Sequence, residues 1–330
     1  MDYSDLAKKL INGNTRAAAR LITIAENDIE AAETIISSIY PHTGKAYIIG
    51  ITGAPGTGKS TFISTLTKNF LDLGMKVGII CVDPTSPLTG GALLGDRIRM
   101  KQHFSLDNVF IRSMANRGQL GGLARATEDV IKILDVYGCD IIIVETVGVG
   151  QSEVDIFKSA QTVVVLVVPG LGDEVQAIKA GIMEITDIFV VNKMDLPGAD
   201  KKVADIMQML EFKKQYKYES KHIGDVFDKI DQWTPEITKV NSKTGENFDT
   251  LLKLINDHRH FLEESGVISN YLKNRIKNET IQILKHKLTK KAEKLINTNE
   301  KIEVFIEKAI KKSIDPYSLA GEILKLFFEK

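Results

Sequence analysis

The stretch Gly53-Ala54-Pro55-Gly56-Thr57-Gly58-Lys59-Ser60-Thr61 fits the pattern G-x-x-x-x-G-K-[ST]. It follows an apolar run at residues 46–52 and precedes a helix-like run at residues 60–71. A glycine-rich loop between a strand and a helix can hold phosphate, because backbone N–H groups and the helix N-terminus converge on the anion. We therefore predict a nucleotide site here, with Lys59 on the β- and γ-phosphates and the Ser60 hydroxyl on Mg²⁺.

The composition excludes several classes of protein. The chain has 330 residues, and Lys plus Arg and Asp plus Glu both total 43, so bulk charge gives no attraction to nucleic acid or to an anionic membrane. Cys81 and Cys139 lie in apolar runs, and we expect buried, reduced thiols rather than a disulfide or a metal pair. No signal-type apolar core opens the chain, and the longest apolar run, residues 163–168, is too short for a bilayer. We expect a cytoplasmic protein without nucleic-acid or membrane partners.

Short apolar runs rich in Val and Ile alternate with helix-length segments from residue 45 onward. Runs without strict alternation are typical of strands buried on both faces of a parallel sheet. The expected strands are residues 46–52, 77–82, 109–111, 141–145, 163–168, 188–191 and 237–240. This order predicts an α/β fold with a doubly wound, mostly parallel sheet, whose ligands bind beyond the carboxyl ends of the strands.

Helical spacing of apolar residues marks both ends of the chain. We expect residues 1–44 to form a helical segment packed on the main domain, with Asn27 or Asp28 capping its second helix. Residues 45–262 then form the nucleotide-binding domain, and residues 263–330 form a helical arm.

The expected arm carries an excess of basic residues together with stripes of apolar residues. Residues 266–330 contain 14 Lys and Arg against 8 Asp and Glu, which is typical of a solvated face. Asp315 before Pro316 resembles a helix N-cap followed by proline. Because its apolar stripes need a cover, we predict that the arm dimerises or grips a partner.

A second motif, Asn192-Lys193-Met194-Asp195, directly follows the run at residues 188–191. It matches the N-K-x-D element of GTPases. The Asp195 carboxylate can accept hydrogen bonds from N1–H and the 2-amino group of guanine, and adenine lacks both donors. A site built around these hydrogen bonds therefore discriminates strongly against adenine nucleotides. We expect Asn192 to tie this loop to the phosphate loop and the Lys193 stem to cover the base.

A third loop completes the expected base site. The segment Asn241-Ser242-Lys243-Thr244-Gly245 follows the expected strand at residues 237–240. It has the place, and the Ser, of the loop whose backbone contacts the guanine oxygen in GTPases.

The segment IIIVETVG at residues 141–148 is an apolar strand that ends in an acid, the Walker B position. Glu145 would touch Mg²⁺ directly or through water, and the N–H of Gly148 is placed to sense a γ-phosphate. Ras-type GTPases carry a water-orienting Gln immediately after the corresponding Gly. Val149 stands there in this chain, and Gln151 follows two positions later. We therefore expect slow intrinsic hydrolysis, or a group borrowed from a partner.

Two further acids and three glycine-rich segments follow expected strands. Asp83 ends the strand beside the phosphate loop, and Asp96 lies in the segment 90–97. Either acid could reach the metal or the attacking water, or could simply cap a helix or turn. The segments 116–122 and 169–174 are also rich in glycine, and such loops suit order–disorder transitions driven by a γ-phosphate.

Histidine gives no metal pattern. His258 and His260 are the one close pair among the six His, and residues two apart on a helix face different sides. We expect both on the surface.

These motifs, in this order, resemble the MeaB family, the methylmalonyl-CoA mutase-associated GTPases, also labelled ArgK. The resemblance covers about residues 10–265 closely and rests on GAPGTGKST, VDPTSP, GGALLGDRIRM, FIRSMANRGQLGGLA, ETVGVGQSE, PGLGDEVQAIKAGIMEI and FVVNKMD. It implies a homodimeric, Mg²⁺-dependent GTPase that binds GTP or GDP and assists an adenosylcobalamin-dependent acyl-CoA mutase. In that role it gates cofactor loading and protects or reactivates the mutase.

The resemblance also implies roles for single residues. Nucleotide contacts fall on Gly53, Ala54, Pro55, Gly56, Thr57, Gly58, Lys59, Ser60, Thr61, Asn192, Lys193, Asp195, Ser242, Lys243 and Thr244. Metal contacts fall on Ser60, Asp83, Asp96 and Glu145, and catalytic roles on Lys59, Asp96, Glu145 and Gly148. Lys179 would be a signalling residue. The sequence SKTGEN departs from relatives that have a small residue after the Ser.

Three other functions stay open. A metal-delivery GTPase for a nickel enzyme would need a Cys/His ligand set near the glycine-rich segments. An amino-acid-transport ATPase or kinase is disfavoured by the Asn192–Asp195 motif. A GTPase could also serve another coenzyme-A mutase, or no mutase.

Overall fold

The computed structural model describes residues 3–84, 108–116, 122–146, 160–170, 185–219 and 233–328. The chain divides into two compact units, Met1–Leu272 and Lys273–Lys330, which are described separately. The amino-terminal helices belong to the first unit.

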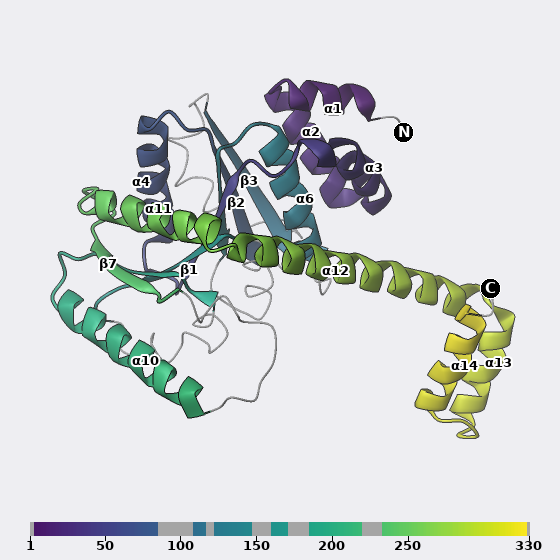
Figure 1. Ribbon diagram of the computed structural model, residues 1–330. Helices are drawn as coiled ribbons and strands as arrows, with labels where there is room; N and C mark the ends of the chain where they lie inside the picture. Colours follow the sequence, from purple (N-terminus) through teal and green to yellow (C-terminus); the bar gives the residue numbers. More distant parts are fainter. Residues whose placement is uncertain are drawn as a thin grey trace. The chain divides into compact units, whose positions relative to one another are not determined.

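The first unit is built on a parallel sheet with seven strands in the described part of the chain (Figure 1). The strand order is β3-β2-β4-β1-β5-β6-β7, so β1 lies in the middle with strands added on both sides. The strands are β1 Tyr47–Gly53, β2 Val77–Pro84, β3 Val109–Asn116, β4 Ile141–Thr146, β5 Thr162–Val167, β6 Ile188–Asn192 and β7 Glu236–Val240. Each corresponds to a predicted run, and the predicted fold class is confirmed.

Helices cover both faces of this sheet. On one face lie α4 (Lys59–Asp72) and α11 (Phe248–Glu264), and on the other lie α6 (Gly122–Val136) and α10 (Ala199–Glu219). Three further helices, α1 (Ser4–Ile11), α2 (Thr15–Asn27) and α3 (Ile29–Ile39), pack on α6 (Figure 1). A 3₁₀ turn at Tyr40–His42 follows α3.

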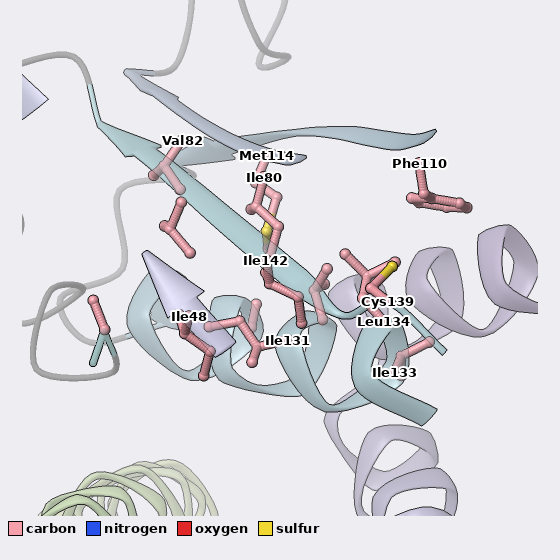
Figure 2. Packing of buried hydrophobic residues seen from close by; sticks show 14 of the residues in the cluster. Ile48, Ile80, Val82, Phe110, Met114, Ile131, Ile133, Leu134, Cys139 and Ile142 are labelled. Atoms are coloured by element: carbon pink, nitrogen blue, oxygen red, sulfur yellow. The ribbon is translucent and has the colours of Figure 1, made fainter. Parts of the chain in front are cut away.

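Neighbouring residues of the central strands fill two separate cores. Ile48 and Ile142 belong to the cluster around α6, whereas Ile49 and Ile143 pack with α4. Figure 2 shows the first cluster, in which strand residues meet Ile131 and the other apolar side chains of α6. Burial on both faces explains why these strands read as continuous apolar runs rather than as alternating ones.

The amino-terminal segment has three helices where the sequence pattern predicted two. Gly13 has φ 76°, and the Asn14 side chain accepts a hydrogen bond from the N–H of Ala17 at 2.9 Å, so a new helix starts there. The cap expected at Asn27 or Asp28 is Asp28, whose Oδ1 accepts from the N–H groups of Glu30 and Ala31, both at 3.0 Å. A side-chain cap of this kind stabilises a helix by about 1 kcal/mol.

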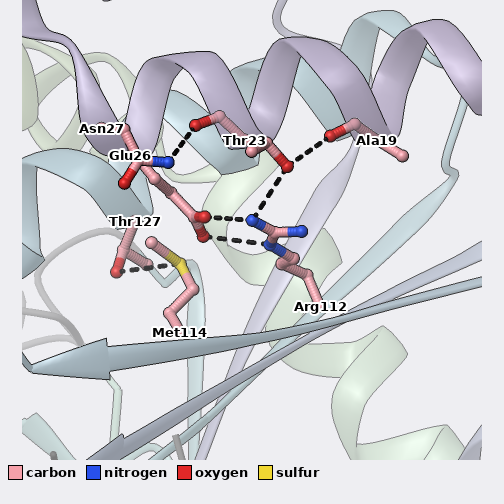
Figure 3. A network of polar contacts seen from close by, with 7 residues as sticks. All are labelled: Ala19, Thr23, Glu26, Asn27, Arg112, Met114 and Thr127. Carbon is pink, nitrogen blue, oxygen red and sulfur yellow. Dashed lines mark hydrogen bonds and ion pairs between the residues drawn. The ribbon is translucent and has the colours of Figure 1, made fainter. Parts of the chain in front are cut away.

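Polar contacts attach these helices to the α/β domain. The Arg112 guanidinium on β3 donates Nε–H to Glu26 of α2 at 3.0 Å, pairs with the same carboxylate through Nη2, and reaches Thr23 at 3.3 Å (Figure 3). On α6, the Asp135 carboxylate accepts the N–H of Gly44, at the end of the amino-terminal segment, and that of Ala46 at 2.9 Å, just before β1. Because β3 ends and α6 begins within the predicted glycine-rich segment 116–122, the helical segment is joined to both elements that border it.

The prediction that His258 lies on the surface was wrong. Its side chain is fully buried, with Nδ1 2.8 Å from the Thr162 hydroxyl and Nε2 3.4 Å from the Asp187 carboxylate. The Trp233 ring packs on it at 4.6 Å between centroids. His260 is exposed, as predicted. The two-residue spacing correctly separates the two sides of α11, but it does not say which side faces the sheet.

Both cysteines are free and buried, as predicted. Burial raises the pKa of the Cys139 thiol to about 12. In the described residues, no helix combines the length and the apolarity needed to cross a membrane.

The second unit contains most of α12 (Val267–Thr298), together with α13 (Glu300–Ile310) and α14 (Pro316–Phe328). The predicted helix start is confirmed, because Asp315 accepts the N–H groups of Tyr317 at 2.8 Å and Ser318 at 3.1 Å. Ile302 is fully buried within this unit. Its exposed large apolar residues are Ile276, Ile281, Leu284, Leu288, Ile296, Val304, Ile310, Tyr317 and Leu324.

Candidate nucleotide-binding site

The phosphate loop joins β1 to α4 at the carboxyl edge of the sheet. Gly58 caps α4 with φ 89°, and Gly56 has φ 87°, backbone conformations that favour glycine. The Lys59 ammonium donates to the carbonyl oxygens of Gly53 at 2.7 Å and Ala54 at 3.3 Å, and its residue is only 8% exposed. These two acceptors are neutral, so an anionic phosphate would compete well for the same ammonium group.

Gly53 is required by packing as well as by backbone conformation. Its φ is 153°, and a Cβ built on it would lie 2.4 Å from the carbonyl oxygen of Leu166 on β5. We predict that Gly53→Ala lowers the free energy of unfolding by about 1–3 kcal/mol more than Gly74→Ala does. Gly74 is the matched control, since it has φ 78° and nothing within 4 Å. Urea unfolding of both variants measures the difference, and equal losses would contradict the clash.

Asn192 connects three loops of the site. Its Nδ2 donates to the carbonyl oxygen of Thr57 in the phosphate loop at 2.8 Å. Its Oδ1 accepts from the Ser242 hydroxyl at 2.7 Å and from the Ser242 N–H at 3.2 Å. The predicted tie to the phosphate loop is therefore present, and it extends to the loop after β7. Asn192 is 1% exposed, so these hydrogen bonds are shielded from water.

The next residue, Lys193, reaches over the phosphate loop. Its backbone has φ 57°, and its ammonium donates to the carbonyl oxygen of Gly56 at 2.9 Å. A Cβ on Gly58 would lie 4.0 Å from its Cε. The aliphatic stem thus runs along one side of the phosphate loop, and its contact with a base stays a prediction.

Asp195 is exposed, but its orientation is set by a residue that the sequence analysis did not single out. The Asn241 Nδ2 donates to Asp195 Oδ1 at 3.0 Å, and the Asn241 Oδ1 accepts the N–H of Lys243 at 3.0 Å. Asn241 itself is 7% exposed. The amide fixes one oxygen of the carboxylate and leaves the second oxygen available to a ligand.

A further contact links this base loop to α4. The Thr65 hydroxyl donates to the carbonyl oxygen of Ser242 at 2.7 Å. No sequence signal marks Thr65, because a threonine in the middle of a helix usually packs or faces solvent. Asn241 had a weak signal, since it opens the loop in which Ser242 was predicted to act.

The predicted Walker B acid lies at the carboxyl end of β4, beside β1. Glu145 is 5% exposed and is the register partner of Ile51, two residues before the phosphate loop begins at Gly53. The following residue, Thr146, donates its hydroxyl to that of Thr52 at 3.3 Å. The backbone of Asp83 lies one residue before the end of β2, opposite Ala115. These positions bring both acids to the same edge of the sheet as the phosphate loop.

The other predicted residues lie outside the described part of the chain. They include Asp96 and its segment 90–97, Gly148, Val149, Gln151 and Lys179. Of the segments 116–122 and 169–174, the structure describes residues 116, 122, 169 and 170.

Several known proteins have sequences similar to that of this chain. PH0274 of Pyrococcus horikoshii is 50% identical over 321 residues, which cover 97% of this chain and 97% of that protein. The GTPase ArgK of Escherichia coli is 34% identical over 264 residues, covering 78% of this chain and 76% of that protein. The methylmalonic aciduria type A homolog of Mus musculus is 28% identical over 335 residues, which cover 96% of this chain and 78% of that protein.

A solved structure shares the fold. The crystal structure of an LAO/AO transport system kinase superposes with a TM-score of 0.66 over 98% of this chain and 97% of that chain. At 22% sequence identity, this likeness shows the architecture alone.

The family assignment follows from the match over most of the chain. Residues 18–297 match the family described as methylmalonyl-CoA mutase-associated GTPase MeaB, so the resemblance inferred from the motifs is confirmed. Together with the loops joined at Asn192, this match leads to one conclusion. The chain belongs to the MeaB family and is a GTPase.

Proposed function

We propose that this protein binds GTP with Mg²⁺, hydrolyses it slowly, and acts as a nucleotide-controlled chaperone of an adenosylcobalamin-dependent acyl-CoA mutase. The observation that carries the nucleotide part is the hydrogen bonding of Asn192, which joins the phosphate loop to the loop after β7. One side chain thereby holds the phosphate-binding and base-binding parts of the site in a common geometry.

Guanine is the base that suits this geometry. Asp195 offers a carboxylate oxygen beside the one held by Asn241, and guanine presents two adjacent donors to such a group. In this proposal the backbone of Ser242, Lys243 and Thr244 lies at the guanine oxygen. The residues Gly53–Thr61 surround the phosphates.

The residues at the sheet edge fit Mg²⁺. This ion takes oxygen ligands, keeps several waters, and is usually held by one or two carboxylates together with substrate phosphates. Ser60 lies in the first turn of α4, and the buried Glu145 is the last residue but one of β4, the strand next to β1. We assign Ser60, Glu145, Asp83 and Asp96 to the metal, which would neutralise phosphate charge when bound.

Slow hydrolysis is proposed from the sequence after the Walker B acid. Val149 has no group that could orient a water, and Gln151 is displaced by two positions from the usual place. A long-lived GTP state suits a switch, because the partner then has time to respond before the nucleotide changes.

The mutase is proposed as partner from the relatives. The family description names methylmalonyl-CoA mutase, and a mouse relative is named for methylmalonic aciduria. If nucleotide state alters mutase binding, thermodynamic reciprocity requires the mutase to alter nucleotide affinity by the same factor.

A homodimer is proposed from the second unit. Leu284 and Leu288 are 51% and 49% exposed and lie one helical turn apart on α12, within the exposed apolar set of that unit. A second copy of the same arm would cover such a stripe with a self-complementary surface. A monomer mass in light scattering would contradict the dimer.

Affinity capture from an extract of the source cells tests the partner. The full chain serves as bait when loaded with GDP or with a non-hydrolysable GTP analogue, and the Asp195→Asn chain serves as control. We expect a cobalamin-dependent acyl-CoA mutase in amounts that differ between the two nucleotides. Hydrogenase or urease subunits in its place would favour nickel delivery and overturn the proposal.

A further inference from the structure

The predicted metal-binding acid has a sulfur neighbour. Cys81 of β2 and Glu145 of β4 are direct register partners in adjacent parallel strands. The Cys81 thiol donates to Glu145 Oε2 at 3.7 Å, a distance within reach of a sulfur hydrogen bond. Both residues are almost fully buried, at 3% and 5% exposure.

The pair lies on the same face of the sheet as α4. Cys81 belongs to the apolar cluster that includes Ile51 of β1 and Phe62 of α4. Ile51 is also the register partner of Glu145 on the other side. Cys81, Glu145 and Ile51 therefore lie side by side on β2, β4 and β1. The strand β1 leads directly into the phosphate loop.

The chemistry of a thiol suits this position. A Lys or Arg partner would neutralise the carboxylate and compete with a cation for it. A Val or Ala would supply no donor. The S–H group is a weak, uncharged donor on a short side chain, so it can orient the acid without neutralising its charge.

We propose that Cys81 is a positioning residue for Glu145, holding the carboxylate in the orientation that favours Mg²⁺ at the nucleotide site. This role rests on the proposed function, in which Glu145 contacts the metal directly or through water. It assigns a task in nucleotide binding to a cysteine that the sequence indicated only as a buried apolar residue.

Magnesium-dependent retention of a fluorescent GDP analogue tests the role without measuring hydrolysis. For Cys81→Ala we expect the Mg²⁺ concentration at half-maximal retention to rise about 3- to 5-fold, as for the loss of one hydrogen bond of ordinary strength, because a thiol is a weak donor. Cys81→Val, which leaves no cavity and has no donor, should shift the midpoint by the same factor. Nucleotide binding in excess EDTA should not change in either variant.

The chain supplies a matched control. Cys139 is also buried, at 2% exposure, but belongs to the cluster on the opposite face of the sheet. Cys139→Ala should leave the Mg²⁺ midpoint unchanged. Urea unfolding of every variant shows whether it is folded. If Cys81→Ala is not folded, the Mg²⁺ midpoint of Cys81→Val is compared with that of the wild type instead.

A double-mutant cycle with Glu145→Gln shows whether the thiol acts through the acid. In the Glu145→Gln background, Cys81→Val should leave the midpoint within the error of the measurement. The same 3- to 5-fold shift in that background, or a wild-type midpoint in Cys81→Val alone, would overturn the role of Cys81. Wild-type retention that ignores Mg²⁺ would overturn the proposed metal site, and this role with it.

Discussion

Replacing Lys59 with Ala should reduce the rate of GTP hydrolysis by roughly 10²–10³-fold, the range found when one preorganised donor to a developing anion is removed. The ammonium is already held inside the loop by the Gly53 and Ala54 carbonyl oxygens, so it needs little reorganisation to meet a phosphate. Phosphoryl transfer depends almost wholly on such positioned charges. Release of inorganic phosphate under single-turnover conditions measures the effect.

Lys68→Ala is the control for this prediction. Lys68 lies on the same helix, α4, but is exposed. Its loss should change the rate by less than about 2-fold, since a surface charge far from bound phosphate is screened by salt. If Lys59→Ala retained the wild-type rate, the assignment of the phosphate loop would be wrong.

Replacing Asp195 with Asn should lower the affinity for GTP by about 10²-fold or more and raise the affinity for XTP. The amide N–H group of the new side chain would then face the two donors of guanine and leave these polar groups unpaired. Unpaired polar groups in a binding site weaken binding strongly, so GTP should lose affinity. Xanthine carries a carbonyl oxygen in place of the 2-amino group, so the amide donor finds an acceptor. Competition of GTP and XTP against a fluorescent GDP analogue measures both changes.

The structure says why the new amide should point correctly. Asn241 donates to Asp195 Oδ1, and in the variant only the amide oxygen could accept that hydrogen bond. The amide nitrogen would then take the place of Oδ2, on the side left for the base. Asp200→Asn is the control, because Asp200 is a nearby exposed acid that pairs with Lys239. GTP binding unchanged in Asp195→Asn would refute the base assignment.

Much of the fold was predictable because its signals are local. The strands of the sheet are short apolar runs, and each is identified without knowing its partners. The phosphate loop and the Asn192–Asp195 motif are contiguous, so their chemistry can be inferred residue by residue. The cap at Asp315 was equally visible, because a cap depends on its own next three residues.

The errors and omissions share a different cause. His258 was assigned to the surface because helical spacing defines faces without saying which one is covered. Cys81 and Glu145 are 64 positions apart, and only the register of β2 against β4 brings them together. Thr65 and Ser242 meet because α4 and the loop after β7 reach the same edge of the sheet.

The sequence by itself determined the kind of fold, and it predicted the phosphate loop and the preference for guanine, because each depends on residues that are neighbours in the chain. The tertiary structure decided how these parts form one site. Parallel strands place their carboxyl ends at one edge, so Thr57, Asn192 and Ser242 meet there despite their separation. Two side chains orient acids that the motifs had marked: Asn241 orients Asp195, and Cys81 orients Glu145. Only the tertiary structure identifies these two side chains, because hydrogen bonds across strands depend on register and not on local sequence.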